Sequence, residues 1–501
     1  MLINSKDITD EILTTEVCII GSGMGGAPLA LELLNDNKNL ILIEAGGNDS
    51  NNGAISDENI GAHFNMEATR TFEVGGGSCI WAGGLAKFEK DDLENNARAW
   101  PIKFKELDEY YCKAGQLFGL PDSDFSIDSL NNKNKSELET IKFSKSFINN
   151  KLYKTPKPVF SFKKLLQDGF RHHESSHLIY NAPALELVFN NGSISLIKFG
   201  TSKGIKCIKA KKFIVSAGAL ESPRLMLNSG IPNPNIGKNL MDHPKCYIGE
   251  LELVRSRMKK NNIYAFMLDE NYGVQIKTSL VINEKIRIKQ KLLNHSVYIR
   301  PIIRNLDVMR KVDDVGTKVH TLKNSKNRIR DLFSLFKDIK TIMYGIIYKY
   351  GSFLRYKKMG VFLVAEQTES FDSHVTLSDK TDYWGYRIAK IKWNIGEDDL
   401  DNIIKFGSFL SSHLNECVYD STKLTKQYLK KHLASAAHHC GTCRIGYNKD
   451  DSVVDKDLKV HGVKNLYICD ASVFKTSGNV NPSYTIAALS LRLADKLLGR
   501  E

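Results

Sequence analysis

The sequence has no apolar run long enough to span a membrane. No stretch of about 18 or more apolar residues occurs among its 501 residues, so we expect no transmembrane helix. Nor does the chain begin like a secretory signal peptide. Residues 1–15 are polar and acidic, and the first apolar run, Val17 to Ile20, leads directly into a glycine turn. We therefore expect a cytoplasmic location, at most peripheral to the inner face of the membrane.

The cysteines do not form the pattern of a disulfide framework. Their number, nine, is odd, and Cys18, Cys207 and Cys469 lie in apolar runs, so we expect reduced packing residues. Internal repeats and low-complexity linkers are also lacking. An apolar fraction of 42% and a charged fraction of 25% are typical of a globular protein. The length is sufficient for two domains with separate cores.

The net charge of +13 is unevenly distributed along the chain. Residues 320–358 contain ten basic and two acidic side chains. Apolar residues at i, i+3, i+4 spacing from Ile329 to Leu354 predict one or two amphipathic helices within residues 326–358. A core-facing helix with a solvated basic face is one interpretation, and a helix lying on a membrane surface is the other. No nucleic-acid-binding module is recognisable, so we expect no nucleic-acid partner.

A glycine-rich turn near the N-terminus has the pattern G-x-G-x-x-G. It runs from Gly21 to Gly26, follows an apolar strand and opens a helix, and Glu44 ends the next strand 23 residues on. Gly21 permits the tight turn, Gly23 lets the backbone approach a pyrophosphate, and Gly26 lets helix and strand pack closely. The helix N-terminus favours phosphate, and Glu44 can accept hydrogen bonds from ribose. A turn without ligand is the alternative, and the motif does not distinguish FAD from NAD.

Segments far apart in the sequence complete one α/β pattern. Strands are predicted at 16–20, 40–43, 212–216 and 466–469, helices at 27–34 and from Ser483, and a hairpin around the Asn190-Asn-Gly192 turn. They predict a nucleotide-binding domain made of residues 1–118, 178–245 and 432–501. Residues 119–177 and 246–431 would form a second domain, where alternation at 373–378 and 386–393 predicts antiparallel strands.

Further motifs follow one another in a characteristic order. They are Glu44-Ala-Gly46, Gly75 to Gly84, Trp100-Pro-Ile102, Ser216 to Leu225, Ile236 to Pro244, His438 to Gly446, Asp470 to Phe474 and Asn481-Pro482. In sequence and order they resemble the FAD-dependent glucose–methanol–choline (GMC) oxidoreductases, nearest to the sugar-oxidising branches. The resemblance covers nearly the whole chain except for about 120–175 and 250–360. It implies a Rossmann-like α/β FAD-binding domain assembled from distant segments and an α+β substrate domain with an antiparallel sheet.

The resemblance also implies which residues contact FAD. The expected cofactor-binding residues are Gly21, Ser22, Gly23, Met24, Gly26, Glu44, Ala45, Gly76, Gly77, Ser78, Trp81, Ala184, Ala217, Asp470, Ala471, Asn481 and Pro482. Some members of the family attach the flavin covalently through a histidine beside the second glycine loop. Cys79, Ile80 and Trp81 occupy that place here, so we expect non-covalent FAD.

The same resemblance implies two catalytic residues. Oxidation of an alcohol needs a base for the hydroxyl proton and an acceptor for the hydride, which the flavin provides. His438 stands at the position of the family's base, and Asn481 at the position of the residue that contacts the substrate oxygen. The neighbouring His439 is an alternative base, and Asn481 could instead cap the last helix. We interpret His243 and His461 as structural.

Cys440 and Cys443 form a C-x-x-C pair beside two histidines. No second C-x-x-C or H-x-x-x-H is present to complete a zinc site, so we expect neither a metal nor a dithiol centre. We expect an enzyme that oxidises an alcohol group on a sugar, polyol or glycoconjugate, with oxidase and dehydrogenase activities left open and no electron acceptor assigned. The alternatives are a lyase with structural FAD and a membrane-surface flavin-binding protein without redox turnover.

Overall fold

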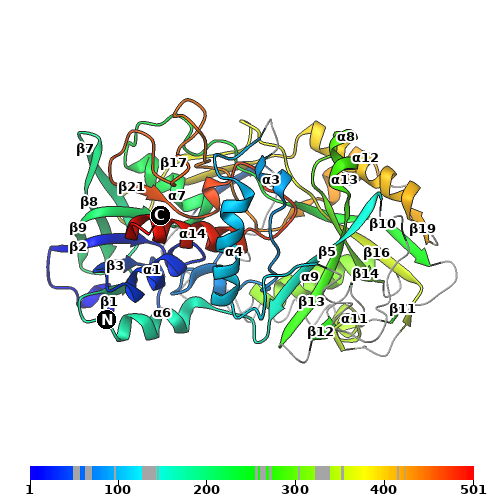
Figure 1. Cartoon of the computed structure of the whole chain (residues 1–501), viewed down its shortest axis with the longest axis horizontal. Coiled ribbons are helices and arrows are strands. Elements are labelled where there is room, and N and C mark those ends of the chain that lie inside the picture. Colours follow the sequence, from blue (N-terminus) through cyan, green and yellow to red (C-terminus); the bar gives the residue numbers. More distant parts are fainter. Residues whose placement is uncertain are drawn as a thin grey trace.

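The computed structural model places two large β-sheets at opposite ends of an elongated molecule, and both chain termini lie near the first sheet (Figure 1). The structure describes residues 1–48, 57–61, 70–94, 98–126, 143, 146–253, 258–259, 264, 267–269, 273–302, 305–321, 339–350, 355–414, 417–421 and 424–500.

The first sheet has the strand order β1-β6-β3-β2-β9-β8-β7, with β21 also paired to β9. Its strands are β1 (Leu2–Asn4), β2 (Ile12–Ile20), β3 (Leu40–Ile43), β6 (His177–Tyr180), β7 (Ala184–Asn190), β8 (Ser193–Thr201), β9 (Gly204–Val215) and β21 (Leu466–Ile468). The pairs that join β1, β6, β3, β2, β9 and β21 are parallel. Residues 17–20 and 40–43 are buried throughout, as expected for parallel strands covered on both faces.

The hairpin that extends this sheet forms at the predicted turn. β7 and β8 are antiparallel, and Asn191 and Gly192 both have positive φ angles, 49° and 75°. Two consecutive positive φ values suit a two-residue hairpin turn, which explains why Asn-Gly occurs here. The parallel strands from 1–43, 177–180, 204–215 and 466–468 confirm a Rossmann-like sheet built from distant segments.

Helices cover the first sheet. They are α1 (Gly26–Asn35), α4 (Phe104–Leu117), α6 (Phe162–Arg171), α7 (Gly218–Asn228) and α14 (Ser483–Leu498). α14 packs against both α1 and α4, and α6 packs against α1. The Ser490 hydroxyl donates to the Gly25 carbonyl over 2.6 Å and so joins α14 to the start of α1. The helices predicted at 27–34 and from Ser483 are confirmed.

The second sheet is antiparallel and has the order β12-β13-β14-β16-β10-β19, with β5 on β13 and β20 on β10. Its strands are β5 (Ile148–Pro156), β10 (Pro244–Leu253), β12 (Met267–Asp269), β13 (Val274–Ile282), β14 (Ser296–Pro301), β16 (Lys358–Val364), β19 (Cys417–Asp420) and β20 (Ala434–Ser435). One face packs on α12 (Glu397–His413) through a core that includes Ile299, Leu363 and Phe406. The predicted antiparallel sheet is therefore confirmed.

The strands predicted at 373–378 and 386–393 lie elsewhere. They form β17 (His374–Thr381) and β18 (Arg387–Trp393), which are antiparallel to each other, and β18 pairs in parallel with β4 (Asp57–Gly61). Val375 and Trp393 pack with Leu220 of α7, so this three-stranded sheet covers the first sheet's side of the molecule. The alternation of polar and apolar residues correctly predicts that one face of these strands is buried, but it does not identify the part of the protein that covers this face.

The remaining elements are α3 (Lys90–Glu94), α8 (Glu284–Lys289), α9 (Leu306–Thr321), α11 (Ile339–Tyr350), α13 (Lys426–His432), the β11–β15 pair (Met258–Lys259 and Arg355–Tyr356) and the short 3-10 helices η1 (Ser5–Asp7), η2 (Gly76–Cys79) and η4 (Ala471–Val473). α11 confirms a helix in part of the basic amphipathic segment, whereas residues 322–338 and 351–354 lie outside the described residues. None of the helices in the described ranges is long and apolar enough to cross a bilayer.

The division into two domains at the predicted boundaries stays a prediction. α6 and the β17–β18 hairpin fall in ranges assigned to the second domain, yet they pack against α1 and α7 of the first. Segments that the sequence assigns to the second domain therefore pack within the part of the structure built on the first sheet.

Candidate active site

A cavity of about 2300 Å³ extends from the glycine turn to the second sheet. Sites for small ligands commonly measure about 300–1,000 Å³, so this cavity has room for a dinucleotide and a second molecule. Its walls come from the carboxyl ends of β2, β3 and β9, from the starts of α7 and α14, and from β10, β13 and β14. The cavity therefore brings the predicted cofactor residues and the predicted catalytic residues to one place.

The glycine turn is shaped by close backbone contacts. Gly21 has φ 98°, and a Cβ on Gly26 would lie 1.9 Å from the Gly21 carbonyl oxygen. A Cβ on Gly25 would lie 1.8 Å from the Cys469 oxygen, so this position also requires glycine. Gly23 differs, because no described atom lies within 4 Å of an added Cβ, and the residue lines the cavity. The turn thus exposes bare backbone at Gly23, where a phosphate could approach.

Glu44 is fixed at the end of β3. One carboxylate oxygen accepts from the Ser22 amide at 3.0 Å and the Ser22 hydroxyl at 2.6 Å, and the other accepts from the Gly46 amide at 2.9 Å. Burial raises the pKa of Glu44, although these hydrogen bonds act in the opposite direction. The side chain lines the cavity, and its remaining lone pairs can accept from ribose hydroxyls.

Most residues predicted to bind the cofactor line this cavity. Only Gly26 and Ser78 of that set do not, since Gly26 packs against Gly21 and the Ser78 hydroxyl donates to the Gly75 carbonyl. The Ser216 hydroxyl, also on the wall, is buried and has no hydrogen-bond partner among the described residues. The N-terminus of α1 has no side-chain cap. Open glycine backbone, an uncapped helix start, a buried carboxyl and an orphan hydroxyl together fit FAD.

His438 is held by a second histidine. The Nδ1 atoms of His243 and His438 are 2.9 Å apart, and His243 Nε2 is 2.9 Å from the Ser477 carbonyl oxygen. A carbonyl oxygen only accepts, so His243 carries its proton on Nε2. Burial lowers the pKa of His243, which keeps the ring neutral, and its Nδ1 therefore accepts from His438. His438 is left with a lone pair on Nε2 at the cavity wall.

The pKa of His438 suits a neutral base. Burial, with the positive charge that His243 would carry, lowers it to about 3. The backbone before it is strained, since Ala437 has φ 65°, a conformation that costs about 1–3 kcal/mol in a non-glycine residue. Asp242 holds this segment in place by accepting from the backbone amides of His243 at 2.6 Å and His438 at 2.9 Å.

His439, the alternative base, lies against Asp242. Its Nε2 is 3.6 Å from an Asp242 carboxylate oxygen. Burial opposes ionisation of Asp242, but His439, His438 and the Ser435 hydroxyl outweigh it and keep the pKa of Asp242 below its usual range. Both histidines line the cavity, but their partners differ. The ring of His439 lies near the Asp242 carboxylate, whereas the ring of His438 contacts the imidazole of His243.

Asn481 lies on the cavity wall and does not cap the last helix. The N-cap of α14 is Pro482, with no side-chain hydrogen bond, and the Asn481 amide nitrogen donates instead to the Gly84 carbonyl at 3.1 Å. This bond ties Asn481 to the second glycine loop. The second N–H of the amide can donate to a substrate oxygen.

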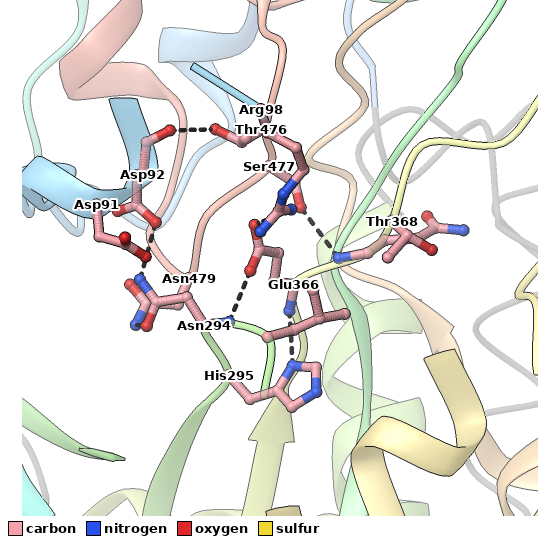
Figure 2. A network of polar contacts seen from close by, with 12 residues as sticks. Asp91, Asp92, Arg98, Asn294, His295, Glu366, Thr368, Thr476, Ser477 and Asn479 are labelled. Carbon is pink, nitrogen blue, oxygen red and sulfur yellow. Dashed lines mark hydrogen bonds and ion pairs between the residues drawn. The ribbon is translucent and has the colours of Figure 1, made fainter. Parts of the chain in front are cut away.

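A buried polar network supports the loop that carries Ser477 and Asn481 (Figure 2). The Thr476 hydroxyl donates to the Asp92 carbonyl at 2.9 Å, and the Asn479 amide donates to the Asn294 side chain at 2.9 Å. These contacts join the loop to residues near α3 and to the chain before β14. They hold the Ser477 carbonyl, and hence the His243 ring, in place.

Glu366 is the centre of this network. Its carboxylate, 1% exposed as a side chain, accepts from Arg98 at 2.7 Å and from the Asn294 amide at 2.6 Å, and its own amide donates to His295 Nδ1 at 3.1 Å. Burial opposes its ionisation, but Arg98 and the Asn294 bond outweigh burial and lower the pKa of Glu366. Arg98 precedes α4, which packs on α14 beside the first sheet, and Glu366 follows β16 of the second sheet, so the ion pair links the two parts of the structure.

Cys440 and Cys443 are buried, and burial raises the pKa of both thiols. Such thiols stay protonated, which suits packing rather than redox chemistry. Within the described residues, no group of His, Cys, Asp and Glu side chains is arranged to hold a metal ion.

Several residues of the site were not predicted from the sequence. His243 was interpreted as structural, although its place directly after Asp242 in the Met241-Asp-His-Pro segment was a usable signal. Gly25 and Ser216 adjoin predicted residues. Basic residues of the second sheet also line the cavity, and single lysines and arginines in alternating strands carry no recognisable motif. They are Lys245, Lys277 and Arg300.

Comparison with known proteins agrees with this geometry. Family models described as GMC oxidoreductase match residues 161–245 and 370–490. The chain is 22% identical to an oxygen-dependent choline dehydrogenase of Sinorhizobium fredii, over 98% of this chain and 96% of that protein. It is 24% identical to a long-chain-alcohol oxidase of Arabidopsis thaliana, over 59% of this chain and 38% of that one.

Solved structures share the fold over nearly the full length. Pyridoxine 4-oxidase from Mesorbium loti superposes with a TM-score of 0.57 at 14% identity and covers 97% of this chain and 100% of its own. A formate oxidase variant from Aspergillus oryzae, studied for FAD modification, gives a TM-score of 0.58 at 15% identity, covering 98% of this chain and 99% of its own.

The matched segments contain the features that form the cavity. Residues 161–245 include Ser216, Asp242 and His243, and residues 370–490 include His438 and Asn481. The cavity wall fits FAD, and the relatives are named for acting on alcohols, so the geometry and the comparisons point to the same kind of enzyme. Two GMC oxidoreductase family models match separate segments of the chain, and together with these relatives they show a GMC-type, FAD-dependent oxidoreductase that acts on CH–OH donors.

Proposed function

We propose that this enzyme oxidises an alcohol group of a sugar, polyol or glycoconjugate, with His438 as the base and Asn481 as the residue that orients the reacting oxygen. The observation that supports this assignment is the His243–His438 pair, whose tautomers leave His438 Nε2 as a bare lone pair on the cavity wall. His438 Nε2 takes the hydroxyl proton, and bound FAD supplies the acceptor for the hydride from carbon.

Asn481, with the buried polar network that supports its loop, keeps the substrate oxygen at a fixed position relative to His438. The bond from Asn481 to Gly84 fixes the amide plane, so that its second N–H points to a constant position. A donor held in this way lowers the cost of ordering the reacting groups. The supports of both residues meet at the loop that holds Ser477, which explains why that loop is anchored by buried polar contacts.

FAD is proposed to be bound non-covalently. Ile80 and Trp81 face the cavity beside the second glycine loop, and the Cys79 thiol lies 3.4 Å from the Ser161 hydroxyl. Acid precipitation should therefore release FAD into the supernatant, and flavin that stays with the pellet would contradict this.

The test of the function is an anaerobic titration of the purified, FAD-loaded protein with sugars, polyols and lipid-linked sugars. Loss of the oxidised flavin absorbance on mixing with one of these alcohols is the expected result. Product formation without any bleaching would instead identify a lyase in which FAD is structural. A protein that neither contains nor takes up FAD would overturn the proposal.

The pH dependence tests the His243–His438 pair. His438 is neutral above its lowered pKa of about 3, so the base form is present at neutral pH and is lost only as the pH falls towards that value. We therefore expect the titration of His438 to leave the rate constant for flavin reduction unchanged from about pH 5 to 8. A histidine with an ordinary pKa near 6.5 would instead lower the rate within this range.

Replacing His243 with alanine removes one hydrogen bond to His438 and should lower this rate constant about tenfold. The rate constant should then also decrease towards acidic pH. His243→Asn keeps an acceptor for His438 Nδ1 and should recover part of the rate. An unchanged pH profile in His243→Ala would show that His243 only fills space.

We also propose that the 326–358 segment contacts a membrane surface. Met343 and Ile346 of α11 are 57% and 53% exposed, and Ile346 also lines the cavity. Flotation with anionic vesicles should carry the protein upward, and replacing both residues with serine should reduce the floated fraction. A protein that stays at the bottom with every vesicle composition would refute this contact.

A further inference from the structure

The second sheet presents three basic side chains to the cavity. Lys245 of β10, Lys277 of β13 and Arg300 of β14 all line it. Ile299, the neighbour of Arg300, is buried in the core on the opposite face of the sheet. Because successive side chains alternate between the faces of a strand, these basic groups are set towards the cavity by the register of the sheet. We call Lys245, Lys277 and Arg300 the cationic wall.

Aromatic rings hold two of these groups in position. The Arg300 guanidinium lies 3.8 Å from the Phe362 ring centroid, and the Lys277 ammonium lies 3.9 Å from the Tyr298 centroid. The strand register places Tyr298 opposite Phe362, so the two contacts lie side by side on the sheet. Cation–π contacts at such distances fix the direction of a cation without neutralising it.

Among the described residues, the acidic side chains that act on the wall come from α9 and from the segment just before β10. Arg300 pairs with Asp313 of α9 at 3.2 Å, and the same carboxylate acts on Lys277. Lys245 experiences the charge of Asp242 first and that of Asp313 after it. Asp314, the residue after Asp313, also lines the cavity. Burial, and then the charge of Arg300, lowers the pKa of Lys277 well below its usual value. Like charges in a poorly hydrated cavity cost free energy, and a bound anion offsets that cost.

The wall reaches the reaction centre. Lys245 follows His243 by two residues at the start of β10, and its charge acts on His438. The glycine turn that would hold the FAD phosphates lies at the opposite end of the cavity, formed by the first sheet. An anion on the wall is therefore separate from the cofactor phosphates and close to the proposed base.

On the basis of the function proposed above, we propose that the alcohol substrate carries a carboxylate or phosphoryl group, which Lys245, Lys277 and Arg300 bind while His438 faces the hydroxyl. The rings of Phe362 and Tyr247, which also line the cavity, pack against the apolar surface of the same molecule. A neutral sugar or polyol fills only part of this surface, whereas its acidic or phosphorylated counterpart also matches the charge of the wall.

The test compares three probes with a common sugar ring: glucose, glucuronate and glucose 6-phosphate. Each is titrated into the FAD-loaded protein, and binding is followed both by the flavin absorbance spectrum and by calorimetry. We expect glucuronate or glucose 6-phosphate to bind at least about tenfold more tightly than glucose, and the preferred one identifies the anionic group. Equal binding of all three would overturn the inference.

Variants of the wall make the comparison specific. Lys277→Gln should raise the dissociation constant of the preferred anion by about 10- to 100-fold and that of glucose by a much smaller factor, while Lys277→Arg stays near the parent value. Lys358→Gln is the matched control, because Lys358 is an exposed lysine of the same sheet that does not line the cavity. An unchanged anion affinity in Lys277→Gln with normal FAD content would refute the wall as the anion site.

The result is independent of the oxidation itself. Anion binding that depends on Lys277, without bleaching of the flavin by any alcohol, would support the wall and overturn the proposed function. Bleaching by alcohols without any preference for charge would support the function and overturn the wall.

Discussion

Replacing His438 with alanine should lower the rate constant for flavin reduction by about 10²- to 10⁴-fold, the usual contribution of a positioned general base. The structure gives this residue a neutral ring, a defined tautomer and a free Nε2 on the cavity wall. Stopped-flow absorbance under anaerobic conditions measures the step directly, with the alcohol that bleaches the parent enzyme fastest. FAD content should be unchanged, because the residues that fit the cofactor phosphates lie at the other end of the cavity.

His439→Asn provides the comparison for this variant. Its ring lies against Asp242, so we expect a smaller loss that reflects a disturbed Asp242 and not a missing base. If His439→Asn abolished reduction while His438→Ala reduced the flavin at the parent rate, the base would be His439, and the tautomer assignment of the His243 pair would have no catalytic meaning.

Replacing Gly23 with aspartate should weaken FAD binding about 100-fold or more. A Cβ at this position meets no described atom within 4 Å, so the fold accommodates the side chain, yet the carboxylate enters the space that the cofactor phosphates need. Like charges brought together in such a site cost several kcal/mol. Fluorescence titration of the apoprotein with FAD measures the loss, and the melting temperature of the apoprotein should not change.

Gly396→Asp is the control for Gly23→Asp. Gly396 has an ordinary extended conformation at the start of α12 and does not line the cavity, and aspartate is favourable at a helix N-cap. FAD affinity should stay at the parent value in this variant. Parent-like FAD affinity in Gly23→Asp would mean that the glycine turn does not contact the phosphates.

Local signals predicted the parts of the fold that are determined locally. The glycine turn, the Asn190-Asn-Gly192 hairpin and the helix that begins at Ser483 each depend on a few consecutive residues, and all are found where they were expected. The antiparallel pair β17–β18 was also predicted, but its partner β4 lies more than 300 residues away. Alternating polarity contains no information about such a partner.

The site was predictable only where it coincides with the family's motifs. His438, Asn481 and the glycine turn occur in recognisable segments, and the structure places all of them on one cavity. The Met241-Asp-His-Pro segment marks His243 as a residue of the site but does not reveal its role, because the orientation of one histidine by another requires the Ser477 carbonyl from a distant loop. The cationic wall depends on the register of three strands, which no single segment reveals.

The buried pair of Arg98 and Glu366 has a consequence for how molecules enter and leave. Swinging the two sheets apart would separate Arg98 from the buried Glu366 carboxylate and leave that charge without its cation, at a cost of several kcal/mol. We therefore expect little hinge motion between the two sheets, and we expect molecules to pass through the opening of the cavity. Ile346 of α11 is exposed and lines the cavity, so it lies on that rim. The rim then limits the size of the substrate, while the cationic wall inside the cavity selects its charge.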